Sequence, residues 1–142
     1  MKSLFSIMAL VGLIAIAPLA SAQQLSKVSG KLSPRSVHGK AVHGYVEVNV
    51  PFGFHIYNPH YKGVGVPTVI SLASGQGFHL VYIGNLKPGL LSGEVKFPIG
   101  LKIGKNVHGR KSIVIAVRFQ QCNDKICLPP VTKDVRLTTF VK

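Results

Sequence analysis

Acidic residues are scarce in this chain of 142 residues, which has four aspartates and glutamates against 17 lysines and arginines. The resulting formal charge of +13 at pH 7 favours acidic partners, such as nucleic acid, an anionic membrane surface or an acidic protein face. The basic residues are scattered, with no run of five or more, which is typical of a solvated surface rather than of a nucleic-acid groove. We therefore predict no nucleic-acid partner.

Tryptophan is absent, and the only methionines are Met1 and Met8, which argues against a thioether copper site in the rest of the chain. The six histidines are dispersed and form no H-x-x-x-H pair, and the cysteines form no C-x-x-C pair. His55 and His60 flank an aromatic stretch, but two thiolates and isolated histidines do not make a complete metal site. We predict no metal and no organic cofactor.

Long apolar runs are missing after the N-terminus, so we predict no transmembrane segment in the mature chain. The run Leu4–Ala17 follows Lys2 and precedes Ala20-Ser21-Ala22. A positive start, a short apolar core and an A-x-A exit predict a secretory signal peptide over residues 1–22. A membrane anchor is the alternative, but this run is short and polar Gln23-Gln24 follows it. The mature chain, 23–142, is large enough for one domain with its own core.

Sustained helical periodicity is also absent after residue 22, whereas apolar and polar residues alternate with period two in many segments. Such alternation is typical of half-buried β-strands. The predicted strands are Leu25–Leu32, Ala41–Val50, Phe54–Tyr57, Thr68–Ala73, Phe78–Ile83, Glu94–Ile103, Lys111–Gln121 and Lys133–Val141. Glycines and prolines fall mostly between them. The pattern predicts a single all-β domain built as a two-sheet sandwich.

Only two cysteines are present, Cys122 and Cys127, in the stretch RFQQCNDKICLPP between the last two predicted strands. In an oxidising compartment a disulfide is their expected resting form. As a structural staple, a six-residue ring contributes only about 2 kcal/mol. A bond in an exposed turn is also open to attack by another thiolate. Residue chemistry alone favours the structural bridge by a small margin and leaves a redox pair open.

The segment FQQCNDKICLPP resembles the Tyr-Gln-x-Cys-x-Asp-x-x-Cys-x-Pro-Pro signature of the N-terminal periplasmic domain of the thiol:disulfide interchange protein DsbD. The segment GFHIYNPHYKGVGVPTVISL resembles that family's Gly-aromatic-His-x-Tyr segment and its Pro-Thr-x-Ile strand. The segment GEVKFPIGLKI is similar to the strand that precedes the cysteine hairpin. All three occur in the family's order, and the resemblance extends from about Val42 to the C-terminus.

The resemblance implies an immunoglobulin-like fold, a periplasmic location and dithiol–disulfide exchange. Cys127 would form the mixed disulfide with a partner, and Cys122 would resolve it. In the family, this domain receives electrons from a thioredoxin-like domain, which a transmembrane domain supplies. It passes them to thioredoxin-like periplasmic proteins, including those of cytochrome c biogenesis. This chain has neither of those further domains, so the expectation includes a separate membrane electron carrier.

The resemblance also implies that neighbouring residues shield the cysteine pair. The candidates for this shielding are His55, Tyr57, Tyr82, Phe119, Asp124 and Pro129. The sequence departs from the family pattern at Phe119, where the family has tyrosine. It also departs over residues 79–91, which correspond to the family's cap loop but have no acidic residue. We therefore expect capping of the cysteines to differ from the family or to be absent.

Two readings from other functional classes stay open on the sequence. In the first, the chain is a non-catalytic secreted binding module whose cysteines form only a structural disulfide. In the second, it handles metal through thiols and histidine. The resemblance favours thiol–disulfide exchange, with the chain acting as one component of a protein-disulfide reductase or electron relay.

Overall fold

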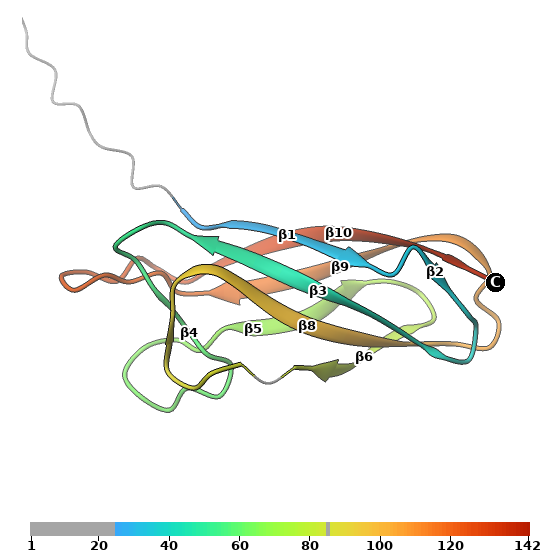
Figure 1. Ribbon diagram of the computed structural model, residues 1–142, viewed down its shortest axis with the longest axis horizontal. Helices are drawn as coiled ribbons and strands as arrows, with labels where there is room; N and C mark the ends of the chain where they lie inside the picture. Colours follow the sequence, from blue (N-terminus) through green and yellow to red (C-terminus); the bar gives the residue numbers. More distant parts are fainter. Residues whose placement is uncertain (1–24, 85) are drawn as a thin grey trace, which may run out of the picture.

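The computed structural model describes residues 25–84 and 86–142, so the predicted signal peptide lies outside the described residues. All the regular secondary structure in the described part is β-strand (Figure 1). The strands are β1 (Lys27–Leu32), β2 (Arg35–Ser36), β3 (Ala41–Val50), β4 (Ile56–Tyr57), β5 (Val69–Ser74), β6 (Phe78–Ile83), β7 (Leu90–Leu91), β8 (Gly93–Ile103), β9 (Gly109–Phe119) and β10 (Val131–Val141).

Two four-stranded sheets form the body of the molecule, in the orders β1-β3-β8-β6 and β2-β10-β9-β5, and β4 pairs with β7 in a small third sheet. The first order is that of strands A, B, E and D of an immunoglobulin sandwich, and β10-β9-β5 is that of G, F and C. The chain changes sheet between β1 and β2. β1 pairs antiparallel with β3 in the first sheet, and β2 pairs parallel with β10 in the second. The prediction of an immunoglobulin-like two-sheet sandwich is confirmed.

The core lies between the two sheets and follows from the period-two pattern. Ile113, Ile115, Val117 and Phe119 of β9 are fully buried, while the residues between them are more exposed. Phe97 of β8 is buried just as completely in the facing sheet. Side chains that alternate in this way present one apolar face to the core, so the sequence pattern and the packing agree.

The observed strands differ from the predicted ones mainly at their ends, where the alternation of apolar and polar residues stops and does not fix the boundary. β9 begins at Gly109, whose φ of 81° suits glycine, and ends at Phe119 rather than Gln121. β10 begins at Val131, which pairs with Phe119. Two strands were not predicted, β2 and β7, because two residues are too few to show a period.

The molecule has two distinct ends (Figure 1). The tip of the β9–β10 hairpin and the turn between β3 and β4 lie at one end, and the C-terminus lies at the other. Within the described ranges, no helix has the length and apolarity needed to cross a bilayer.

Candidate functional site

The two cysteines lie in the connection between β9 and β10 and form a disulfide, with 2.06 Å between the sulfurs. Asn123 shapes the turn between them. Its Oδ1 accepts hydrogen bonds from the backbone N–H groups of Lys125 and Ile126, at 2.9 and 2.8 Å. Its own N–H donates to the carbonyl of Ile126 at 2.9 Å. An asparagine that bonds its own following backbone is a strong turn former, so the local sequence brings the two sulfurs together.

The two cysteine residues differ sharply in exposure. Cys122 is 1% exposed, and its backbone exchanges two hydrogen bonds with that of His55, at 2.9 and 3.0 Å. Cys127 is exposed to solvent. Cys127 is therefore the cysteine of the pair that solvent reaches, while Cys122 is enclosed beside the segment that carries His55.

Tyr57 of β4 supplies a polar contact to the buried sulfur. Its hydroxyl donates a hydrogen bond to Cys122 Sγ at 3.3 Å and lies 3.9 Å from Cys127 Sγ. The ring is held by aromatic neighbours: His55 contacts it edge-on at 5.4 Å, and Tyr61 lies 4.7 Å away, centroid to centroid. A phenol O–H aimed at a sulfur stabilises negative charge on that sulfur, because hydrogen bonds to ionised groups are stronger than neutral ones.

The loop between β4 and β5 covers Tyr57. A Cβ added at Gly65, whose φ is +136°, would collide with the Tyr57 ring, so only glycine permits this close approach. The loop is fastened at Val66, whose N–H donates to Gln120 Oε1 at 3.0 Å, and at Thr68, whose hydroxyl donates to the Tyr57 carbonyl at 2.6 Å. These contacts fix the ring that points at the disulfide.

The segment 86–91 rests on β4, the strand that carries Tyr57. Leu90 and Leu91 of β7 pair with Tyr57 and Ile56. The side chain of Asn58 donates to the carbonyl of Lys87 at 2.8 Å. This segment therefore packs against the strand that carries Tyr57, and the contacts that fix it are made to β4 and Asn58.

The remaining predicted site residues lie in different surroundings. Phe119 is fully buried in the sandwich core, and Asp124 and Pro129 are exposed on the hairpin. Tyr82 is 53% exposed on β6 and pairs with Gly100 in the sheet formed by β1, β3, β8 and β6. The structure thus gathers His55, Tyr57 and the two cysteines, and it leaves Tyr82 apart from them.

Sequence reasoning missed several residues that hold the site. Tyr61 and Gly65 enclose Tyr57, and the glycines at 63 and 65 are a turn signal for that loop. Gln121, next to the first cysteine, is 1% exposed. Its Oε1 accepts hydrogen bonds from the backbone N–H and the hydroxyl of Ser26, each at 2.8 Å, which fastens the start of the sandwich to the hairpin.

In the part of the chain that the structure describes, no three residues among His, Cys, Asp and Glu are grouped in a way that could hold a metal ion.

No family model matches this chain, and no curated protein matches it by sequence. Two solved structures are similar in fold. The N-terminal periplasmic domain of ScsB from Proteus mirabilis has 18% identity over 78% of this chain, with a TM-score of 0.49, and the match spans only 44% of that chain. The collagen-binding subdomain of the Enterococcus faecalis surface protein ACE has 9% identity over 82% of this chain and 97% of its own, with a TM-score of 0.33. At these values the likenesses carry nothing about activity.

Proposed function

We propose that this chain carries out thiol–disulfide exchange with thioredoxin-like partners in the periplasm. The observation that carries the proposal is the asymmetry of the disulfide. Cys127 is exposed, whereas Cys122 is 1% exposed and accepts a hydrogen bond from Tyr57. Accessible disulfides are the labile ones, and a staple that served only stability would need no donor aimed at one sulfur.

The exchange proceeds in two steps that balance. A partner thiolate attacks Cys127 Sγ, the bond between Cys122 and Cys127 breaks, and Cys122 leaves as a thiolate. The second thiol of the partner, once deprotonated, then attacks the partner's first sulfur in the mixed disulfide and releases Cys127 as a thiolate. The partner is oxidised to a disulfide, and this chain gains two electrons and takes up two protons. Run in reverse with an oxidised protein, the same steps pass the electron pair on.

Tyr57 assists the first step because its hydroxyl already donates to the sulfur that becomes charged. Better stabilisation of the leaving thiolate makes exchange faster. The hydroxyl also lies within 3.9 Å of Cys127 Sγ, so the donor stays close to both sulfurs through the cycle. No organic cofactor or metal takes part in these steps.

Exposed apolar side chains at the hairpin end support docking of a protein partner. Phe52, Val64 and Ile126 lie on the turn after β3, on the loop after β4 and on the cysteine hairpin, at 104%, 95% and 43% exposure. Leu90 of β7 is 55% exposed. Apolar groups that surround a reactive bond suit a transient partner interface. The export signal read at residues 1–22 and the resemblance to the DsbD domain support a periplasmic location and a separate membrane electron carrier.

Covalent trapping tests the proposal. In the Cys122→Ser variant, Cys127 keeps a thiol, and the partner is a thioredoxin-like protein whose second active-site cysteine is replaced by serine and whose first is held in a disulfide with thionitrobenzoate. Cys127 displaces the thionitrobenzoate, and neither protein then has a second thiol to break the product. We expect a stable mixed disulfide, detected by non-reducing gel and mass spectrometry. The matched Cys127→Ser variant leaves only the enclosed Cys122 and should trap at least about tenfold less. Equal trapping by both variants, or by neither, contradicts the proposed roles.

The reduction potential separates this function from that of a binding module with a structural bridge. A labile pair should equilibrate with glutathione or thioredoxin. A potential well below about −300 mV, with no exchange with thioredoxin, is the property of a structural disulfide and would favour the non-catalytic binding module.

A further inference from the structure

A basic groove of about 770 Å³ lies at the end of the sandwich opposite the cysteine hairpin, where the chain passes from β1 to β2. We call it the basic groove. Leu32, Leu137 and Phe140 are among the residues that line it, and none of the lining residues is an aspartate or a glutamate. Five cationic side chains line it: Lys31, Arg35, Arg110, Arg136 and Lys142.

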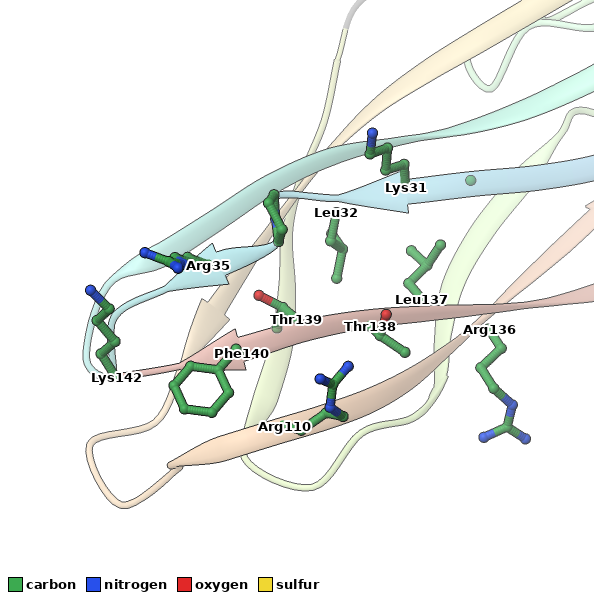
Figure 2. Close-up of a pocket in the computed structure, with 12 residues that line it drawn as sticks. Lys31, Leu32, Arg35, Arg110, Arg136, Leu137, Thr138, Thr139, Phe140 and Lys142 are labelled. Carbon is green, nitrogen blue, oxygen red and sulfur yellow. The ribbon is translucent and has the colours of Figure 1, made fainter.

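The cations surround the groove rather than fill it (Figure 2). Arg110 reaches from β9 toward β10, and Arg35 and Lys142 lie together at the β2 end. Lys31 and Arg136 project from its two flanks. Five cationic side chains, with no aspartate or glutamate in the lining, repel one another and attract a ligand that carries several negative charges.

The backbone beside the groove offers unused hydrogen-bonding groups. β10 pairs with β9 along its whole length, but β2 covers its other edge only at Phe140 and Val141. The N–H of Phe140 donates to the carbonyl of Pro34 on the β2 side, at 3.0 Å. Backbone direction alternates along a strand, so Arg136 and Thr138 aim their N–H and C=O groups to that same side, beyond the end of β2. Among the described residues, no strand pairs with them there.

We propose that the basic groove binds an extended acidic peptide segment of another protein, which adds as a strand to the free edge of β10. The backbone of Arg136 and Thr138 would supply the strand pairing, and the surrounding cations would pair with carboxylates on the peptide. Alternating N–H and C=O groups match a peptide backbone. A phosphate or a lipid headgroup would use only the donors.

A second copy of this chain does not suit the groove. Of the four acidic residues, Glu47 and Glu94 already contact Lys96, at 3.6 and 2.8 Å. Two copies that each carry a charge of +13 also repel each other. The partner is therefore a different and acidic protein.

The groove and the disulfide can be used at the same time. On β10, residues 131–135 lie between the cysteine hairpin and Arg136, the first groove residue on that strand, which is about 17 Å of strand. A partner held in the groove leaves Cys127 accessible, so the groove provides anchoring that is independent of the exchange reaction.

The test uses a fluorescent peptide of alternating glutamate and valine and the intact mature chain. We expect saturable binding by fluorescence anisotropy that weakens as salt is raised. We also expect the backbone amides of Arg136 and Thr138 to exchange with deuterium at least about tenfold more slowly when the peptide is bound. A lysine–valine peptide should do neither.

Charge-reversal variants locate the binding. Arg35→Glu combined with Arg110→Glu should weaken peptide binding at least about tenfold. The matched control, Lys87→Glu combined with Lys102→Glu, changes the net charge equally but away from the groove and should have a much smaller effect.

Each other outcome overturns the proposal. Equal weakening in the two double variants would show general attraction to a basic protein. Binding to phosphatidylglycerol vesicles that depends on Arg35 and Arg110, without amide protection by the peptide, would assign the groove to a membrane surface. Absence of peptide binding would indicate that the cations only protect the free edge of β10 from pairing with other chains.

Discussion

At the scale of single residues, the hydroxyl of Tyr57 is the hydrogen-bond donor to the disulfide on which the proposed exchange depends. We predict that Tyr57→Phe, which keeps the ring, slows reduction of the disulfide by dithiothreitol about tenfold. The physical reason is that a hydrogen bond to a developing thiolate contributes about 1.4 kcal/mol. Stopped-flow kinetics measure the rate. Tyr61→Phe is the control, because that ring lies beside Tyr57 but its hydroxyl contacts Gly63. Equal rates in the wild type and Tyr57→Phe would remove Tyr57 from the mechanism.

Another residue-scale prediction concerns the scarce acids. The Lys96 ammonium, 2.8 Å from Glu94, lowers the pKa of that carboxyl through a hydrogen bond and then through its charge. We predict that Lys96→Met raises the pKa of Glu94 toward its ordinary value, because both effects are lost. An NMR titration of the carboxyl carbon measures this change. Lys102→Met should leave the Glu94 titration unchanged. An unchanged Glu94 pKa in the Lys96→Met variant would contradict the ion pair.

At the scale of elements, the loop over Tyr57 couples folding to the site. We predict that Gly65→Ala destabilises the domain by about 2 kcal/mol or more, because the new Cβ meets the Tyr57 ring and the φ of +136° is strained. Gly53→Ala is the matched control, since its φ is +81° but its surroundings are open. It should lose only about 1 kcal/mol. Urea unfolding gives both values, and equal losses would mean that the ring contact is unimportant.

The strands also show which parts of the fold the sequence predicts. Period-two alternation predicted the long strands such as β3 and β8, because each has one face in the core. It could not predict β2 or β7, whose two residues show no period. The cysteine hairpin was predictable from local residues. The contact between Tyr57 and Cys122 joins positions 65 residues apart, so no local rule predicts it, and only the family resemblance placed Tyr57 near the pair.

At the scale of the whole molecule, the disulfide lies in the connection beyond β9, and the main hydrophobic cluster between the sheets is built without it. Residues such as Phe97, Leu101 and Ile115 are fully buried between the sheets. We predict that reduction, or the Cys122→Ala/Cys127→Ala double variant, lowers the free energy of unfolding by about 2 kcal/mol at most. The β-sheet circular dichroism spectrum should persist, and a thermal melt measures the loss. Collapse of the spectrum on reduction would identify the bond as a structural requirement and count against a redox cycle.

Because Cys127 is exposed and Cys122 is buried, small oxidants and thiols should react with only one cysteine of the pair. In the reduced state, glutathione disulfide can add only at Cys127, so a single adduct forms rather than a mixture. The thiol of Cys122 then lies behind that adduct, next to the sulfur it must attack, and expels the glutathione. Such a pair would remove a glutathione adduct without a repair enzyme.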